Sequence, residues 1–423
     1  MPRLLITHAE ALVGTHPAGT RLLRGSDMAV LPQVADGWLL VEDGRIAAFG
    51  TMTDPIPAAG TGTQVIDASG RYVLPGWCDP HTHTVFAAPR EEEFVDKIRG
   101  LSYQEIAARG GGILNSAAKL RAMQEDDLYE QARTRLERMM AQGTVAVEIK
   151  SGYGLSVESE LKMLRVARRL QASLPLQVRT SLLAAHALPP EYTNDRVGYV
   201  DLIVDELIPR AKAEGLADFV DIFCETNYFT VAELERVLEA GTAHGLRGKV
   251  HVNQFTSIGG LQAALKHSAL SVDHLEVMTE ADIEALATAA EPPIPTLLPS
   301  CSFFIRIPYA PARAMIDRGL GVALATDLNP GTTPSGNMNF VLSLACIQLR
   351  MLPEEAINAM TLNSAAAMGL EHELGSITVG KRASLLITDP VPSLAYLPYD
   401  FGNPHIDTVI IDGTIVRAGK AIA

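Results

Sequence analysis

Imidazole and carboxylate side chains recur at the ends of predicted β-strands along this chain. The first of these strands ends with His81 and His83, and the two-residue period of an extended chain places both imidazoles on the same side. Later strands end with His251, His274 and Asp327. Imidazole and carboxylate ligands together suit Zn, Fe or Mn, and three or four of them leave a coordination position for water. The sequence therefore predicts a catalytic metal site, in which the ion would lower the pKa of a bound water.

These histidines could also have structural roles in turns or helix caps. Two histidines separated by one residue fit a turn or a helix cap equally well, but the agreement of four strand ends favours a metal site. His186 follows the third strand, where it could face a pocket or serve structure before Pro189 and Pro190. The remaining histidines lie in the end segments, on helices or in loops and are given no role: His8, His16, His244, His267, His372 and His405.

Alternating strand and helix patterns fill the middle of the chain. Helical periodicity covers residues 128–142, 158–172, 231–244 and 258–266. Eight strands are predicted at residues 73–79, 145–150, 177–185, 219–224, 248–252, 270–274, 295–298 and 321–326. Such repetition is typical of a (β/α)8 barrel, an α/β fold whose active site forms where the strands end.

Both ends of the chain contain short strand-like runs. They fall at residues 4–6, 38–41, 45–49 and 64–66, and again at 384–388, 408–411 and 414–417. Neither end is large enough for a core of its own, so we expect them to join into one small β-sandwich domain. The predicted division is residues 1–72 and 373–423 for this composite domain, and residues 73–372 for the barrel.

Composition narrows the class of partner. The 423 residues are 47% hydrophobic and carry a formal net charge of −14, which argues against nucleic-acid and anionic-membrane surfaces and favours a small-molecule substrate. The four cysteines are far apart, so no disulfide framework or zinc ribbon is expected: Cys78, Cys224, Cys301 and Cys346. No apolar run suits a signal peptide or a bilayer span, so we expect a cytoplasmic protein.

Taken together, these residues resemble the amidohydrolase superfamily of metal-dependent barrels. The likeness rests on Pro75 and Gly76 leading into the histidine pair, and on the later His, His and Asp, and it spans nearly the whole chain. Many members carry a bridging lysine on the fourth strand that holds a second metal, but the matching segment, residues 221–225, has none. The resemblance therefore implies one metal ion. Lys150 ends the second predicted strand, where a structural role is expected.

Four segments are similar to one family within this superfamily, whose members open the ring of 4-imidazolone-5-propanoate to N-formimino-L-glutamate in L-histidine degradation. These segments are residues 79–83 with 90–94, residues 110–113, residues 150–154 and residues 325–332. The resemblance implies hydrolysis of a cyclic amide C–N bond and a homodimer. It implies one Zn or Fe ion on His81, His83, His251 and Asp327, and a substrate pocket lined by Arg90, Tyr153, His186, Gln254, Asn329, Gly331 and Thr332.

Chemical reasoning gives several of these residues specific roles. Asp327 is the expected general base, while His274, whether or not it binds metal, could stabilise the oxyanion or pass a proton to the leaving nitrogen. Arg90 offers a planar fork for a carboxylate, although the three glutamates that follow it make a surface ion pair the alternative. Asn329 and the residues after it could equally form a turn.

Rival functions remain at this point. Deaminases of the superfamily often place a Glu three residues after the strand-five histidine, where this chain has Gln254, and an amide cannot shuttle a proton as a carboxylic acid does. Val252 and Asn253 also depart from the Ala-Asp that the resemblance leads us to expect. The alternatives are a cytosine- or guanine-type deaminase, a hydantoin-type cyclic amidase, and a silent binding protein on the same barrel.

Overall fold

The computed structural model describes residues 3–101, 105 and 111–419. Eight parallel strands pair in chain order, so that each is hydrogen-bonded to the next. A parallel bridge between Thr82 and Leu328 brings the last strand region against the first. The predicted (β/α)8 barrel is confirmed. Its strands are β6 (Trp77–Thr82), β7 (Thr144–Lys150), β8 (Gln177–Ala185), β9 (Phe219–Cys224), β10 (Arg247–Val252), β11 (Ser271–His274), β12 (Ile294–Leu297) and β13 (Ala323–Leu324).

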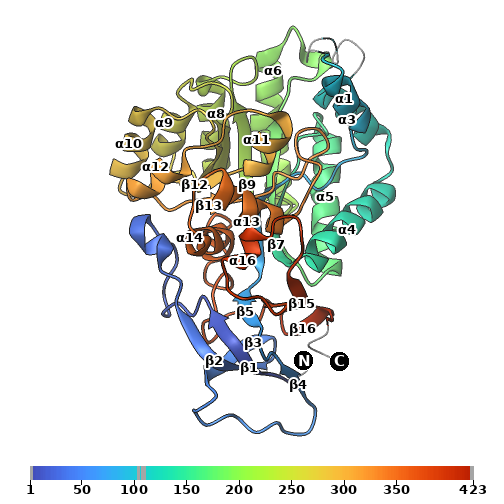
Figure 1. Cartoon of the computed structure of the whole chain (residues 1–423). Helices are drawn as coiled ribbons and strands as arrows, with labels where there is room; N and C mark the ends of the chain where they lie inside the picture. The colour runs from blue at the N-terminus through green and yellow to red at the C-terminus, as the bar shows by residue number, and fades with distance from the viewer. Residues whose placement is uncertain (1–2, 102–104, 106–110, 420–423) are drawn as a thin grey trace.

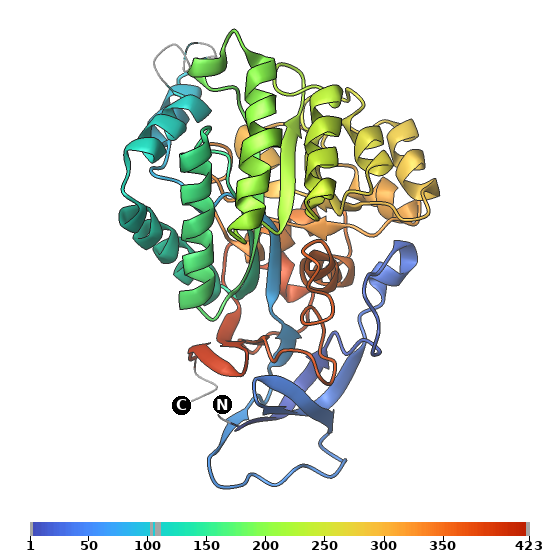
Figure 2. The ribbon, with the colours of Figure 1, turned by 180° about the vertical axis from the view of Figure 1, so that it is seen from behind.

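Helices surround the barrel on the outside (Figures 1 and 2). Their buried faces and the barrel strands share one large apolar cluster, which holds the strand ends in fixed positions. The helices that pack along the barrel or beyond its strand ends are α1 (Glu91–Ile98), α3 (Ile113–Ala122), α4 (Glu125–Ala141), α5 (Val157–Ser173), α6 (Arg196–Asp201), α7 (Ile208–Ala213), α8 (Val231–Ala243), α9 (Gly260–Lys266), α10 (Glu280–Thr288), α11 (Pro299–Ile305), α12 (Ala312–Asp317), α13 (Met338–Ile347), α14 (Pro353–Asn358), α15 (Ser364–Ala366) and α16 (Tyr396–Tyr399). Two 3-10 helical segments are η1 (Gly25–Ala29) and η2 (Pro190–Tyr192), and two π-helical segments are η3 (Leu202–Leu207) and η4 (Ala359–Asn363).

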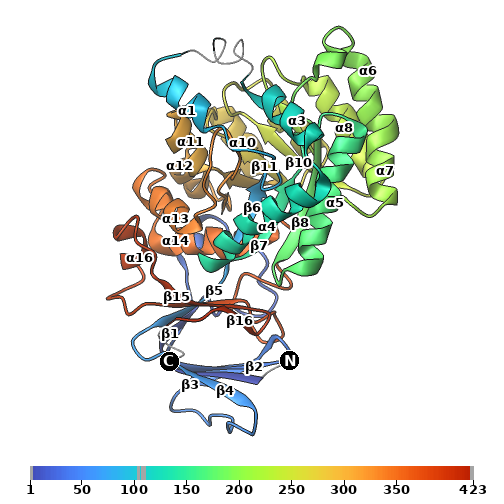
Figure 3. The same cartoon turned by 90° about the vertical axis from the view of Figure 1, so that its right-hand side faces the viewer.

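A second sheet combines the two ends of the chain, as predicted. Strand β5 pairs in parallel with β1 from the beginning of the chain and antiparallel with β14 from its end. The sheet curves around its own apolar cluster (Figure 3). Its strands are β1 (Arg3–Val13), β2 (Gln33–Glu42), β3 (Arg45–Thr51), β4 (Thr63–Asp67), β5 (Tyr72–Pro75), β14 (Leu385–Thr388), β15 (Ile406–Ile411) and β16 (Thr414–Arg417).

The predicted strand at residues 73–79 is wrong in one respect, because it is two strands belonging to two sheets. The chain leaves β5 of the end sheet and enters β6 of the barrel through Gly76. A Cβ at this position would lie 2.2 Å from a Val145 methyl, so only glycine fits the junction. A continuous apolar run carries no mark of this change of sheet.

The last barrel strand is also shorter than predicted. Strand β13 covers two residues, because the Asp79 carboxylate takes the next hydrogen bonds. It accepts the Thr326 backbone N–H at 3.0 Å and the Thr326 hydroxyl at 2.6 Å. Asp327 then has a φ of 57°, a left-handed conformation that turns its side chain out of the ladder direction. None of the described helices combines the length and apolar character needed to cross a membrane.

Candidate active site

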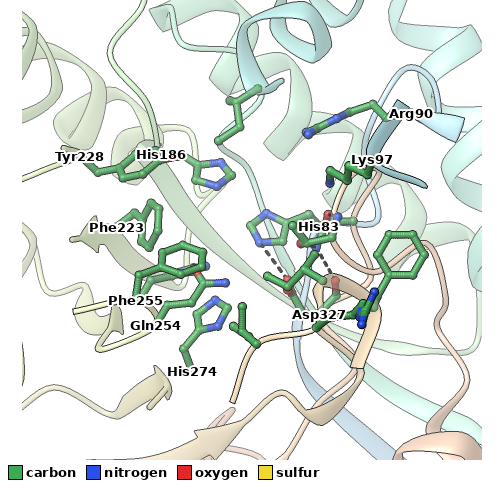
Figure 4. A pocket seen from close by; sticks show the side chains of 18 of the residues that line it. His83, Arg90, Lys97, His186, Phe223, Tyr228, Gln254, Phe255, His274 and Asp327 are labelled. Carbon is green, nitrogen blue, oxygen red and sulfur yellow. Dashed lines mark hydrogen bonds and ion pairs between the residues drawn. The ribbon is translucent and has the colours of Figure 1, made fainter. Parts of the chain in front are cut away.

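Four side chains from the ends of three barrel strands converge. His81 and His83 stand at the end of β6, His251 lies in β10, and Asp327 follows β13. The Nε2 atoms of His81 and His83 are each 3.6 Å from Oδ1 of Asp327, and the ring centroids of His81 and His251 are 4.4 Å apart. All four residues are buried. His83 and Asp327, which come from strand ends more than 240 residues apart in the sequence, are thus neighbours in the structure (Figure 4).

The imidazoles of His81 and His251 are each held by a carboxylate on one ring nitrogen. Nδ1 of His81 lies 2.7 Å from Asp273, and Nδ1 of His251 lies 3.0 Å from Asp221. These carboxylates fix Nδ1 as the protonated nitrogen. The opposite Nε2 atoms are buried without a hydrogen-bond partner among the described residues. A cation bound by these lone pairs would satisfy them, so the donor set fits a metal ion.

Burial also sets the protonation state of these histidines. Desolvation lowers the pKa of His81, His83 and His251 well below its ordinary value, and neighbouring cationic groups lower it further. Neutral imidazole is the form that binds metal. The site therefore holds its histidine donors ready for a cation.

A buried ionic cluster lies behind the histidines. Lys150 donates to Asp221 at 2.8 Å and to Glu148 at 2.6 Å, and its Nζ is 3.4 Å from Asp273. Lys249 pairs with the other oxygen of Glu148 at 2.7 Å. Burial alone would lower the pKa of Lys150, but the three carboxylates raise it above its ordinary value. Lys150 thus holds Asp221 and Asp273, the two carboxylates that orient the histidine rings. This is a structural role, as expected for Lys150.

His274 occupies the end of β11 beside this cluster. Its ring centroid is 5.4 Å from that of His251 and 5.7 Å from that of His81. Its Nδ1 lies 3.3 Å from Glu276, which also accepts the Ser302 hydroxyl at 3.2 Å. Burial alone would lower the pKa of His274, but the facing Glu276 raises it above the ordinary value. A group in this position can donate a hydrogen bond or a proton to a substrate in the cavity.

A cavity of about 520 Å³ lies against His83, His251, His274 and Asp327 and is also lined by residues of α1 and α11. Figure 4 shows this cavity from close by. Its size suits a small heterocycle rather than a polymer. Its wall contains three basic side chains, several aromatic rings and four of the histidine and aspartate side chains at the strand ends. The residues concerned are Arg90, Lys97, Arg306, Phe94, Phe223, Tyr228, Phe255, Phe304, His83, His251, His274 and Asp327.

The structure brings most of the predicted pocket residues to this cavity. Its wall includes Arg90, Tyr153, His186, Gln254, Asn329 and Thr332. Gly331 is not part of the lining, but it packs directly against Arg90. Of the glycine segment at 110–113, Gly110 lies outside the described residues.

A buried glutamate shapes the loop that carries Tyr153. Glu160 accepts backbone N–H groups of Gly152, Gly154 and Leu155 at 2.7–2.9 Å. Gly152 has a φ of 106°, and its carbonyl is 3.0 Å from Nδ1 of His186. The other imidazole nitrogen is thereby left toward the cavity. Sequence reasoning missed Glu160, because an acidic residue in the first turn of a helix ordinarily complements the helix dipole.

The segment after Asp327 is a turn as well as a part of the wall. Asn329 accepts the backbone N–H groups of Gly331 and Thr332 at 2.8 and 2.7 Å, and it donates to the Asp327 carbonyl at 2.8 Å. The turn alternative and the pocket prediction are therefore compatible. This turn fixes the backbone that directly follows the aspartate.

Sequence reasoning also missed Lys97 and the two carboxylates behind the histidines. Asp221 and Asp273 stand inside strands that are otherwise apolar, and this was a signal that could have identified them. Lys97 gave no such signal, because a lysine on an amphipathic helix is ordinarily expected to extend its ammonium group into solvent.

Gly331→Ala should disturb Arg90 without unfolding the protein. A Cβ at residue 331 would lie 2.4–2.6 Å from the guanidinium, so Arg90 would have to move. We expect the KM for a carboxylate substrate to rise about tenfold, the order of one charge-assisted hydrogen bond. Steady-state kinetics and thermal unfolding would measure this. Gly60→Ala is the control, because its Cβ would meet only an Arg3 nitrogen at 3.8 Å, and an equal KM change in both variants would contradict the prediction.

Comparison with known proteins places this geometry in a family. The model of the amidohydrolase family matches residues 72–416, so the fold and the site are those of an amidohydrolase. An imidazolonepropionase from Christiangramia forsetii is 52% identical over 98% of this chain and 100% of its own length. The chain belongs to the imidazolonepropionase family of amidohydrolases.

Solved structures extend the likeness at the level of the fold. A triazine hydrolase variant has a TM-score of 0.76 at 16% identity, covering 99% of this chain and 95% of its own. An adenosine deaminase from Xanthomonas campestris with bound zinc has a TM-score of 0.71 at 16% identity, covering 99% of this chain and 94% of its own. These identities establish the shared barrel architecture and no shared substrate.

Proposed function

We propose that this chain hydrolyses the cyclic amide C–N bond of 4-imidazolone-5-propanoate, giving N-formimino-L-glutamate in L-histidine degradation. The observation that carries the proposal is a single cavity with His83, His251 and Asp327 in its wall together with the guanidinium of Arg90. The polar cluster suits attack on an amide carbon, and the basic wall suits a carboxylate tail. The imidazolonepropionase relative of C. forsetii supports the same substrate.

The metal in this proposal is one Zn or Fe ion held by His81, His83, His251 and Asp327. The unpartnered nitrogens of His81 and His251 support these ligands. When bound, such an ion acts as a Lewis acid and makes hydroxide available near neutral pH. Imidazole and carboxylate donors accept both metals, so metal supply to the cell decides between them.

The protein's own groups orient the substrate and move protons. Asp327 accepts a proton from the attacking water. His274, held by Glu276, stabilises the developing oxyanion and delivers a proton to the departing ring nitrogen, so that the amine leaves neutral. Tyr153 and His186 form the facing wall, where their ring centroids are 5.3 Å apart, and they orient the flat ring.

A deaminase is the nearest rival, and Gln254 counts against it. This amide donates to the Cys301 thiol at 3.6 Å and lines the cavity, so it stands where a deaminase would use a carboxylic acid. Since an amide has no proton to shuttle, ammonia release from a purine or pyrimidine is disfavoured.

The direct test is incubation of the metal-loaded protein with imidazolone propanoate. Loss of the substrate's ultraviolet absorbance with stoichiometric formation of N-formimino-glutamate is expected, together with about one metal ion per chain. Cytosine, guanine and hydantoin run in parallel. Faster turnover of any of these, with release of ammonia or of a carbamoyl acid, would replace the proposal by the corresponding rival.

Arg90→Gln should raise KM far more than it lowers kcat. The change removes the charged fork but keeps a hydrogen-bonding amide, so ground-state and transition-state binding of the tail weaken together. We expect a rise in KM of about ten- to a hundredfold. An unchanged KM would remove Arg90 from the tail-binding site.

We also propose that the enzyme is a cytoplasmic homodimer. The net charge of −14 and the small-molecule cavity support a metabolic role away from nucleic acid and membrane surfaces. Light scattering coupled to size exclusion measures the mass, and a mass near the 45.4 kDa of one chain would exclude the dimer.

A further inference from the structure

Besides Arg90, the cavity wall contains two basic side chains that the proposed mechanism leaves unused, the exposed Arg306 and the half-buried Lys97. Lys97 lies in the last turn of α1, one residue before its end, and lines the same cavity as Arg90. Both side chains contact Gly331: the Arg90 guanidinium packs on its Cα side, and Nζ of Lys97 lies 3.4 Å from its carbonyl oxygen. In Figure 4 the two residues stand on the same side of the cavity. They form a pair of cations around one glycine.

The two cations differ in their electrical balance. Arg90 is neutralised by Glu93, which accepts its Nε at 3.0 Å and its Nη2 at 2.9 Å. The side chains of this pair are 8% and 11% exposed, and the other Glu93 oxygen accepts the Gly112 N–H at 2.8 Å. Two donors of the guanidinium are therefore committed. The Arg90 guanidinium keeps a fixed direction and one edge for a ligand, but the Arg90–Glu93 ion pair carries no net charge.

In the part of the chain that the structure describes, Lys97 has no such ion-pair partner. Among the described residues, no carboxylate oxygen lies within 4.0 Å of its Nζ, and its one hydrogen bond goes to the neutral Gly331 carbonyl. The side chain is half-buried against the cavity. Desolvation, followed by the nearby Arg90, lowers the pKa of Lys97 below its ordinary value, and the charge of Glu93, which makes no ion pair with Lys97, offsets this lowering only in part.

We propose that Lys97 is a specificity-determining residue that supplies the net positive charge for the substrate's carboxylate tail, while Arg90 fixes the orientation of that tail. The inference rests on the proposed function for the identity of the substrate. A balanced Arg–Glu pair offers directed hydrogen bonds but little attraction for an anion, so an unbalanced ammonium beside it selects a charged tail over a neutral one of the same size.

Lys97→Met and Lys97→Arg test this with two substrates. The first is imidazolone propanoate, and the second is its tail amide, which keeps the size but lacks the charge. For the acid, Lys97→Met should raise KM about ten- to a hundredfold with kcat within about threefold, and Lys97→Arg should restore most of the affinity. For the amide, wild type and Lys97→Met should have equal KM. Equal KM for the acid in wild type and Lys97→Met, or the same loss with both substrates, would overturn the proposal.

Arg99→Gln is the matched control, at the residue that caps the C-terminus of α1. The Arg99 side chain is 70% exposed and does not line the cavity, so the substitution removes one positive charge next to α1 without touching the tail. We expect KM for the acid to change less than about twofold. A change equal to that of Lys97→Met would mean a general field effect and would overturn the local role of Lys97.

A binding measurement separates this inference from the proposed reaction. Titration calorimetry of metal-free protein with imidazole-4-propanoate, which cannot be hydrolysed, should give a Kd about ten- to a hundredfold weaker in Lys97→Met than in wild type. If wild type fails to hydrolyse imidazolone propanoate but shows this loss, the reaction is wrong and the anion site stands. If wild type turns over and the two Kd values agree, the role of Lys97 is wrong. Thermal unfolding of each variant, with Lys97→Gln as a second substitution, separates misfolding from lost binding.

Discussion

Replacing Asp327 by Ala should reduce kcat/KM by roughly a thousandfold or more, and His81→Ala should do the same. Each substitution removes a donor from the cluster in which Oδ1 of Asp327 lies 3.6 Å from Nε2 of His81. The expected result has two parts, loss of activity and loss of bound metal. Metal analysis after dialysis, with kinetics on the same samples, measures both.

His16→Ala is a useful control for these variants. His16 is also buried, but its Nε2 pairs with Asn358 at 2.9 Å, outside the ligand cluster. It should lose stability and keep its metal. A fully active, metal-free Asp327→Ala or His81→Ala enzyme would contradict the metal-dependent mechanism.

Lys150→Met should weaken metal binding about ten- to a hundredfold, although Lys150 is not a proposed ligand. The substitution leaves Asp221 and Asp273 without the ammonium that lies 2.8 and 3.4 Å away, so the two histidine rings lose their fixed orientation. The free energy of unfolding of the metal-free protein should also fall by about 3–5 kcal/mol, because buried carboxylates are left without a counter-charge. Metal competition titrations and denaturant unfolding measure the two effects separately.

Lys249→Met separates orientation of the ligands from general damage to the buried cluster. Lys249 is equally buried, but its ion pair is with Glu148 at 2.7 Å. Among the described residues it makes no ion pair with Asp221 or Asp273, and it acts on Asp273 only at longer range. It should cost comparable stability and much less metal affinity. Adding Asp221→Asn to Lys150→Met should recover stability, since it removes one uncompensated charge. Equal loss of metal affinity in the two lysine variants would refute the positioning role.

Most of the barrel was predictable from sequence because its strands are uninterrupted apolar runs between helices with a clear period. The predicted strands at 177–185 and 219–224 coincide with β8 and β9. The passage from β5 to β6 was not predictable, since one apolar run serves two sheets and its only break is Gly76. Which partner strand a segment finds is decided by the tertiary structure rather than by local propensity.

The polar cluster was predictable for a related reason. Parallel strands end at one face of a barrel, so His81, His251 and Asp327 could be grouped without knowing any distance. What could not be read was the set of contacts across neighbouring strands, such as Lys150 to Asp221 or the Arg90–Glu93 pair inside the wall. The sequence left Arg90 with two alternatives, and the structure contains the ion pair within the pocket wall rather than at the surface.

The shared end sheet has a consequence for how the polypeptide matures. The Arg71 guanidinium donates to the carbonyl of Thr388, 317 residues further along the chain. Strand β5 pairs with β14 across nearly the same sequence separation. During synthesis the early strands therefore emerge long before their partner exists, and their unpaired edge is exposed to other chains. Synthesis of β14, rather than folding of the barrel, closes this edge, and nascent chains stalled before β14 should depend on chaperones to stay unaggregated.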